Sequence, residues 1–207
     1  MINEVLKLDK TKKRIGLMGG TFDPIHFGHL LAAEESHREL ELDEVIFVPT
    51  GQPPHKSGVS NQEHRYDMTL IATVGIPYFS VSRMEIDRGK SSHTIDTLRE
   101  FLAIKGEDVE FYFITGLDAI LSIATWKEYM KLPEFCRLVT VTRPGYSSEN
   151  LDELPLKIKE AIIFIEIPRF SLSSTNIRER ISEGKGAKYL VPDAVEDYIK
   201  KSKLYLR

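Results

Sequence analysis

Cysteine is nearly absent from this sequence of 207 residues, because Cys136 is the only one. A single cysteine cannot form a disulfide within the chain, and it cannot supply the thiolates of a metal cluster. Cys136 lies between Phe135 and Arg137 at the start of an apolar run. We therefore predict that it is a buried structural thiol.

Long apolar runs and a strong excess of one charge are also missing. Residues 1–13 have no apolar core like that of a signal peptide, and no run approaches the length that crosses a bilayer. The 28 lysines and arginines against 31 acidic residues give a net charge of −3, which argues against broad nucleic-acid binding. We expect no membrane and no nucleic-acid partner, with a cytoplasmic location as the default.

What the sequence does contain is an alternation of short apolar runs with helical patterns, which is typical of βαβ units. Strands are predicted at 14–18, 44–49, 79–86, 109–115, 138–142 and 162–167. Helices are predicted near 28–40, 62–74 and 94–105. This order predicts an α/β fold, Rossmann-like and doubly wound, with a mostly parallel sheet and helices on both faces. Tyr112 lies inside a predicted strand, so we expect it in the core or behind the site.

The whole chain, residues 1–207, is predicted to form one domain of this type. Within it, about 14–167 would be the Rossmann-like core, and about 168–207 a small C-terminal helical subdomain with helices over 177–183 and from Pro192 to about Lys201. Two polar segments rich in proline and glycine, 50–62 and 143–155, are predicted as loops.

The first candidate site is residues 19–29, which follow the first predicted strand and open a helix. Gly19, Gly20 and Gly28 would let the backbone come close to an anion, and a helix N-terminus offers N–H groups and a partial positive charge. His26 and His29 add donors at the same place. The alternative is a strand–turn–helix junction whose histidines only cap and pack. The glycine pair, the strand before and the helix after favour a phosphate site.

The second candidate site is Ser173-Ser174-Thr175 with Arg178, at the start of another predicted helix. Serine and threonine at a helix start cap free N–H groups, and capping alone would explain the cluster. Arg178 lies one turn into the helix and points back toward the same end. Hydroxyls, N–H groups and a guanidinium together would make a second anion pocket. The presence of the first phosphate site favours this second interpretation.

Together these two segments resemble the nucleotidyltransferase family that carries H-x-G-H and S-T-x-x-R signatures, and within it the bacterial nicotinate-nucleotide adenylyltransferases. The resemblance extends from about residue 14 to the C-terminus. Five further landmarks of that family occur in order: Pro53-Pro54-His55-Lys56, Thr94-Ile95-Asp96-Thr97-Leu98, Gly116-Leu117-Asp118, Trp126-Lys127 and Arg143-Pro144-Gly145.

The resemblance implies transfer of AMP from ATP to nicotinate mononucleotide, giving deamido-NAD and pyrophosphate. The acceptor's own phosphate oxygen would attack the α-phosphorus in line, so no protein nucleophile is needed. The implied catalytic residues are His26 and His29, which would stabilise the α-phosphate, and Arg178. Mg²⁺ would arrive with ATP, because no set of ligands dedicated to a metal is visible in the sequence. The implied ATP-binding residues are Gly19, Gly20, Thr21, Phe22, His26, Gly28, His29, Gly116, Asp118, Ser173, Ser174, Thr175 and Arg178.

The acceptor-binding residues implied by the resemblance are His55, Lys56, Thr94, Trp126 and Arg143. Trp126 could stack on the pyridine, or it could be a core or lid residue. Lys56 could meet the acceptor phosphate or remain a solvated loop lysine. The chain has His93 where the family commonly has tyrosine, so the wall of the acceptor pocket is expected to differ.

Three alternatives remain open at the level of sequence. The same chemistry could act on nicotinamide mononucleotide, because carboxylate and amide differ by a few contacts. Pantetheine-phosphate adenylyltransferases share the superfamily, but they are shorter, usually have T-x-G-H and lack the segment around Trp126. A nucleotide-binding sensor is the non-enzyme alternative, and the intact His26, His29, Ser174 and Arg178 argue against it. A homo-oligomer is possible, as in many members of the family.

Overall fold

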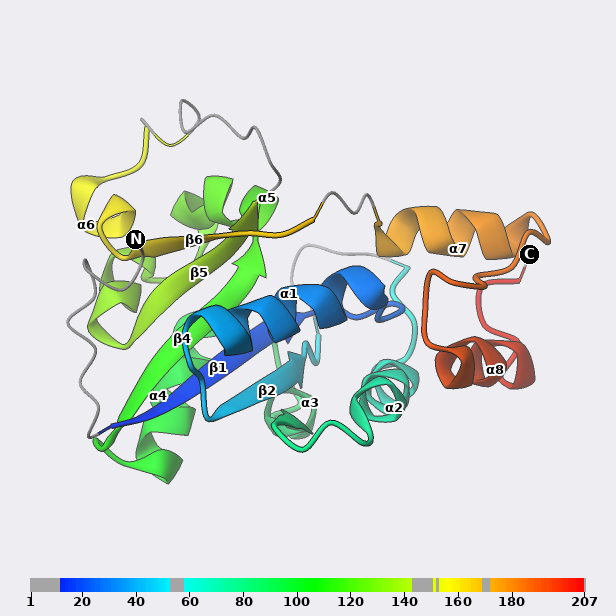
Figure 1. Ribbon diagram of the computed structural model, residues 1–207, viewed down its shortest axis with the longest axis horizontal. Coiled ribbons are helices and arrows are strands. Elements are labelled where there is room, and N and C mark those ends of the chain that lie inside the picture. Colours follow the sequence, from blue (N-terminus) through cyan, green and yellow to red (C-terminus); the bar gives the residue numbers. More distant parts are fainter. Residues whose placement is uncertain (1–11, 53–57, 143–150, 152, 169–171, 207) are drawn as a thin grey trace.

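The fold is built on one sheet of six parallel strands in the order β3-β2-β1-β4-β5-β6 (Figure 1). This computed structural model describes residues 12–52, 58–142, 151, 153–168 and 172–206. The strands are β1 Lys13–Gly20, β2 Glu44–Pro49, β3 Phe79–Val81, β4 Val109–Gly116, β5 Cys136–Thr142 and β6 Ile162–Glu166. The predicted α/β, Rossmann-like fold is therefore confirmed, and the sheet is parallel throughout.

The strand order places a topological switch point between β1 and β4. The chain runs from β1 outward to β2 and β3 on one side, and then returns to β4 and continues to β5 and β6 on the other. Connections leave the carboxyl ends of β1 and β4 in opposite directions, which opens a crevice between them. The segment with the two histidines follows β1, and Gly116 ends β4, so both lie at this crevice.

Helices cover both faces of the sheet because side chains alternate along each strand. Ile15 and Leu17 of β1 pack into a core with α4, α5, α6 and the short 3-10 helices, whereas Met18 packs into a core with α1, α2, α7 and α8. β4 alternates in the same way, with Phe111 on the first side and Tyr112 on the second. The helices are α1 Phe27–Glu39, α2 Gln62–Thr73, α3 Met84–Asp87, α4 Thr94–Lys105, α5 Leu117–Leu121, η2 Ile123–Thr125, η3 Tyr129–Glu134, α6 Leu156–Lys159, α7 Ser174–Ser182 and α8 Asp193–Lys201.

The third predicted strand, 79–86, is wrong in its second half. Only Phe79–Val81 pairs with β2, and residues 84–87 form the short helix α3. The hydroxyl of Ser82 accepts a hydrogen bond from the N–H of Met84 at 3.2 Å, and Asp87 N–H donates to the carbonyl of Arg83 at 2.9 Å. The apolar residues Met84 and Ile86 follow Phe79 and Val81 but fall out of phase with their alternation, and the local bond of Ser82 accompanies the turn of the backbone into a helix.

Two buried residues agree with the predictions made for them. Cys136 is 6% exposed, and burial raises the pKa of its thiol to about 12, so it stays a neutral packing group. Tyr112 is fully buried, and its hydroxyl donates to Glu110 at 2.9 Å. Among the described residues, no helix is both long and apolar enough to cross a membrane.

The last two helices lie beyond the carboxyl ends of the strands, and α8 packs beside α2 (Figure 1). The hydroxyl of Tyr198 on α8 donates to Asp67 of α2 at 2.7 Å and lies 3.0 Å from Nδ1 of His64. Buried apolar residues of α7 and α8, including Ile177 and Val195, belong to the same core as α1 and α2. The C-terminal helices are thus packed onto the end of the sheet where the candidate site lies.

Candidate active site

The two sequence motifs meet in space although they are about 150 residues apart in the chain. The hydroxyl of Ser174, at the start of α7, donates to the carbonyl of Pro24 at 2.9 Å. Nη1 of Arg178 donates to the carbonyl of Asp23 at 2.8 Å. Both acceptors lie in the loop between β1 and α1, just before His26 and the first turn of α1 that contains His29. The two motifs therefore lie in direct contact, as a single phosphate site would require.

The rings of His26 and His29 stack in the first turn of α1. Their centroids are 3.7 Å apart with an angle of 17° between the planes. The N–H of His26 donates to Nδ1 of His29 at 3.2 Å. A ring nitrogen that accepts carries no proton, so neutral His29 holds its proton on Nε2 and donates from there. The ring of Phe22 meets His29 edge-on at 5.1 Å, which further fixes its orientation.

Two backbone amides of this turn already have partners inside the protein. The N–H of Phe27 donates to the carbonyl of Leu190 at 3.1 Å, and that of His29 to the carbonyl of His26 at 2.9 Å. The expectation that the helix N-terminus offers its N–H groups to an anion is therefore wrong for these two. Leu190, in the C-terminal part of the chain, binds the N–H of Phe27, and the sequence could not indicate this contact. Histidine rings are better placed to donate than these amides.

The glycines of the motif are explained by close packing. A Cβ on Gly28 would lie 3.0 Å from Nδ1 and 3.1 Å from Cε1 of His26, so a side chain there would displace the ring. A Cβ on Gly20 would lie 2.6 Å from the ring of Phe22. On Gly19, it would lie 2.9 Å from the ring of Phe113. These glycines bring the backbone and the rings into contact beneath the site.

Burial sets the protonation state of His26. The residue is 5% exposed, and desolvation lowers the pKa of its imidazole from 6.5 to about 4. His26 is therefore neutral near pH 7 and can act as a hydrogen-bond donor without carrying a charge. Its Nδ1 lies against Gly28 and has no hydrogen-bond partner among the described residues.

This burial predicts a measurable pH dependence of stability. Between pH 6.5 and about 4 the unfolded chain binds a proton at His26 and the folded chain does not, so the free energy of unfolding should fall as pH falls through this window. Titration of the ring by NMR should show His26 neutral at pH 6. The His26→Gln variant should lack this part of the pH dependence. A midpoint near 6.5 in the folded protein would contradict the assignment.

The start of α7 combines capping with contacts to the first motif. Ser173 is the N-cap, and its hydroxyl accepts from the N–H of Asn176 at 3.2 Å. Nη2 of Arg178 donates to Oγ1 of Thr175 at 3.3 Å, so the guanidinium does reach back to the helix start as expected. The capping interpretation holds for Ser173, while Ser174 and Arg178 join the two motifs.

Gly116 and Asp118 lie at the end of β4, across the switch point from the histidines. Both are exposed, and Gly116 is the N-cap of α5. A Cβ on Gly116 would meet nothing within 4 Å, and its φ is −74°. Neither packing nor backbone conformation within the described protein therefore requires a glycine here. Open space in front of it is what the approach of a ligand would need.

On the acceptor side, the structure brings two of the landmarks together. Thr94 begins α4 directly after its N-cap His93. The ammonium of Lys127, next to Trp126, is 2.9 and 3.0 Å from the carboxylate oxygens of Asp96 in the first turn of α4. His55, Lys56 and Arg143, which were also predicted for the acceptor, lie outside the described residues.

Trp126 is half-buried and packs against the core under α4. Its ring meets Phe113 edge-on, with centroids 5.9 Å apart. The core or lid alternative therefore has direct support, although the residue is only partly buried.

Sequence reasoning missed Arg65, Asp23 and Tyr205, which meet behind the first motif. Arg65 is 1% exposed, and Asp23 is 3% exposed. Oδ1 of Asp23 accepts from the hydroxyl of Tyr205 at 2.7 Å, and Oδ2 accepts from the N–H of Ser60 at 3.1 Å. One signal for Arg65 was available, because it shares a helical stripe with buried Met68 and Ala72. No local sequence pattern predicts that Tyr205 contacts Asp23.

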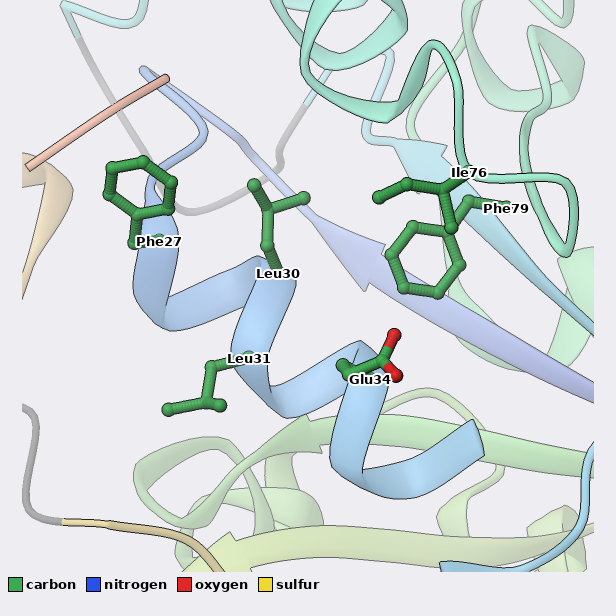
Figure 2. Close-up of a pocket in the computed structure, with 6 residues that line it drawn as sticks. All are labelled: Phe27, Leu30, Leu31, Glu34, Ile76 and Phe79. Atoms are coloured by element: carbon green, nitrogen blue, oxygen red, sulfur yellow. The ribbon is translucent and has the colours of Figure 1, made fainter. Parts of the chain in front are cut away.

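A separate apolar cavity of about 470 Å³ lies along α1, outside this site. Figure 2 shows its lining: four residues of α1, together with Ile76 and Phe79. Phe27 belongs to the lining although it stands between the two histidines in sequence. None of the predicted site residues lines this cavity. It therefore reflects an apolar side of α1 distinct from the histidine side.

Comparison with known proteins agrees with this arrangement. A family model described as cytidylyltransferase-like matches residues 17–180. A relative from Moorella thermoacetica, named "Probable nicotinate-nucleotide adenylyltransferase", is 50% identical over 198 residues, which cover 93% of this chain and 91% of the relative. A relative of the same name from Thermus thermophilus is 50% identical over 192 residues, which cover 93% of this chain and 99% of the relative.

The fold also matches solved structures. That of Plasmodium falciparum nicotinic acid mononucleotide adenylyltransferase complexed with NaAD has a TM-score of 0.76 at 24% sequence identity, and the match covers 93% of this chain and 97% of that chain. At this identity the likeness concerns the fold, whereas the relatives at 50% identity extend over almost the whole chain. The chain therefore belongs to the nicotinate-nucleotide adenylyltransferase family.

Proposed function

We propose that this chain transfers AMP from ATP to nicotinate mononucleotide, giving deamido-NAD and pyrophosphate, at the site formed by the two motifs. The observation that carries the proposal is the contact of Ser174 and Arg178 with the loop that leads into His26 and the first turn of α1. This contact supports one phosphate site with donors from both ends of the chain. The family to which the chain belongs supports the choice of substrates.

The reaction needs positioning and charge stabilisation more than a protein nucleophile. An oxygen of the mononucleotide phosphate, already ionised near pH 7, attacks the α-phosphorus of ATP, and the bond to the pyrophosphate oxygen breaks. His29 is proposed to donate from Nε2 to the α-phosphate, and neutral His26, whose ring stacks on that of His29, is proposed to donate to the same phosphate. The N–H groups of Gly20, Thr21 and Phe22 are proposed to contact the same phosphate oxygens.

Arg178, Ser174 and Thr175 are proposed to hold the β- and γ-phosphates. Arg178 uses Nη1 for Asp23 and Nη2 for Thr175, and a guanidinium has five N–H donors, so donors remain for a phosphate. A positive charge at this place would stabilise the leaving pyrophosphate. Ser173 contributes through its cap, which fixes the first turn of α7.

A divalent cation is proposed to arrive bound to ATP. Mg²⁺ usually keeps several waters and binds substrate phosphates with few protein ligands. Within the described ranges, no three His, Cys, Asp or Glu side chains come close enough to hold a metal. Both carboxylate oxygens of Asp23 already accept hydrogen bonds, whereas Asp118 is exposed at the crevice. Such a site suits a cation held by phosphate and water, which neutralises charge on the triphosphate.

The acceptor base is proposed to lie between the start of α4 and the segment of Trp126. The ion pair of Lys127 with Asp96 holds these two segments together. The edge contact with Phe113 fixes the plane of the Trp126 ring, which suits stacking on a pyridine. His55, Lys56 and Arg143 remain proposed contacts of the acceptor. We further propose a cytoplasmic enzyme without nucleic-acid partners that can form homo-oligomers.

An acceptor panel tests the substrate assignment. Pyrophosphate release should require ATP, Mg²⁺ and nicotinate mononucleotide together, and omission of any one should abolish it. Nicotinamide mononucleotide and phosphopantetheine serve as competing acceptors at equal concentration. Much faster turnover with either of them would overturn the proposed acceptor. Release of pyrophosphate from ATP without any acceptor would argue against adenylyl transfer.

The glycine at the end of β4 gives a second prediction. Gly116→Ala should change the free energy of unfolding by less than about 1 kcal/mol, because the site accepts a Cβ and the lower flexibility of unfolded alanine opposes its poorer capping of α5. The same methyl group would occupy space proposed for ATP, so KM for ATP should rise by about tenfold, equivalent to about 1.4 kcal/mol. Urea unfolding and steady-state kinetics measure the two effects. Unchanged kinetics would remove Gly116 from the nucleotide site.

A further inference from the structure

Arg65 is the largest fully buried side chain of the protein among those described, and its guanidinium is held by carbonyl oxygens. Nη1 donates to Thr21 at 2.8 Å, Nη2 to Gly51 at 2.8 Å and Nε to Ser60 at 3.0 Å. The three acceptors belong to different segments: the loop after β1, the loop after β2 and the chain before α2. A planar guanidinium can bridge such a set because its donors point outward in fixed directions.

The contact with Thr21 fixes the peptide that follows it. In a trans peptide the carbonyl and the next N–H point in opposite directions, so an oxygen held by Arg65 directs the N–H of Phe22 away from Arg65. Phe22 has a φ of 51°, in the left-handed region that a phenylalanine rarely adopts. A residue in this conformation needs its surroundings to hold it. The hydrogen bond from Arg65 to the carbonyl of Thr21 fixes the peptide on the N-terminal side of Phe22.

The charge of Arg65 lies behind the phosphate loop. Burial lowers the pKa of its guanidinium, and the charges of Asp23, Tyr205 and Glu85 act in the opposite direction. An arginine nevertheless stays protonated at any working pH. Asp23 is itself held by Tyr205 and Ser60, so the cation is enclosed by groups with fixed positions.

We propose that Arg65 is a positioning residue for adenylyl transfer, which directs the N–H of Phe22 toward the α-phosphate and keeps the loops after β1 and β2 in register. The inference rests on the proposed function, since it assigns a role at the same site. Gly51 lies close against the backbone of Glu85, because a Cβ added there would be 2.3 Å from the carbonyl oxygen of Glu85, so only glycine fits at this contact. Arg65 therefore connects the backbone after β1, at Thr21, with the backbone after β2, at Gly51.

Arg65→Lys is the first test, because lysine keeps the charge but cannot bridge three carbonyls from one nitrogen in the same geometry. At 20 °C, in protein that circular dichroism shows to be folded, kcat should fall by about 10²-fold, as expected for a misdirected donor. The Kd for ATP, measured by calorimetry, should change by less than about fivefold. The control is Arg83→Lys, because Arg83 also binds the first turn of α2, through Glu63, and should leave kcat unchanged.

Chemical rescue separates positioning from general stability. Ethylguanidinium added to Arg65→Ala should restore part of kcat, whereas ethylammonium should not, because only the first has the fork of donors. A folded Arg65→Lys variant with wild-type kcat would overturn the proposal. Equal rescue of kcat by ethylguanidinium and ethylammonium would also overturn it.

A measurement on the wild-type protein covers the case in which the variants do not fold. The amide resonance of Phe22 should shift on addition of ATP with Mg²⁺, and it should remain in place when Mg²⁺ alone is added. No shift with ATP would overturn the proposed direction of this N–H. Every variant is compared with wild type on the same acceptor, so a different acceptor preference would overturn the substrate assignment without affecting the result for Arg65.

Discussion

Replacement of His29 by alanine is expected to lower kcat by roughly 10²–10³, the loss seen when one donor to a developing charge is removed. The ring is fixed before substrate binds, because Nδ1 accepts from the N–H of His26 and Phe22 packs on its edge. In the neutral ring the proton is therefore on Nε2, which can act as a hydrogen-bond donor. The donors of Arg178 that no protein group uses remain, so the Kd for ATP should change little. Steady-state kinetics of pyrophosphate release and calorimetry with ATP measure the two quantities.

Two further variants make this result interpretable. His37→Ala removes another histidine of α1, whose ring stacks on Tyr78 at 3.8 Å, and it should keep kcat within about twofold while losing some stability. His29→Gln carries an amide that can reach toward the position of Nε2, so part of kcat should return. If His29→Ala turns over like wild type, His29 only packs and caps. Loss of stability with an unchanged kcat would lead to the same conclusion.

Removal of the guanidinium of Arg178 should have an effect at least as large. Arg178→Met is expected to lower kcat/KM for ATP on the order of 10³-fold, the lower end of the range for arginines that stabilise a transferring phosphate. Two causes act together. The charge proposed for the leaving pyrophosphate is lost, and the carbonyl of Asp23 loses its partner, so the first motif is no longer joined to α7 through this bond.

The companion variants distinguish these two causes. Arg178→Lys keeps the charge but loses the fork, so it should recover only part of the activity. Arg180→Met, on the same helix and exposed, is the matched control and should behave like wild type. Thermal unfolding of each variant sets the assay temperature, because an unpartnered buried carbonyl costs about 1–3 kcal/mol. An Arg178→Met variant with full activity would contradict the phosphate role.

The sheet could be predicted closely because each strand is a local pattern. Apolar runs such as 44–49 match β2 at both ends, and the helix predicted at 94–105 matches α4. The error at 79–86 arose because Met84 and Ile86 were counted with the strand although they are out of phase with Phe79 and Val81, and the hydroxyl of Ser82 bonds to the start of a helix there. The short helices after β4 were not predicted, because three to six residues are too few to show a helical period.

The sequence by itself determined the family resemblance, the parallel sheet and the two motifs. These features could be recognised because each depends on residues that are close together in the sequence. Tertiary structure alone decided which donors of His26–His29 are already used, since the carbonyl of Leu190 takes the N–H of Phe27. It also decided that Arg65 binds the phosphate loop through backbone carbonyls. The residue types that carry these carbonyls give no sign of the contact. Backbone acceptors can come from any residue, so contacts of this kind follow only from the folded chain.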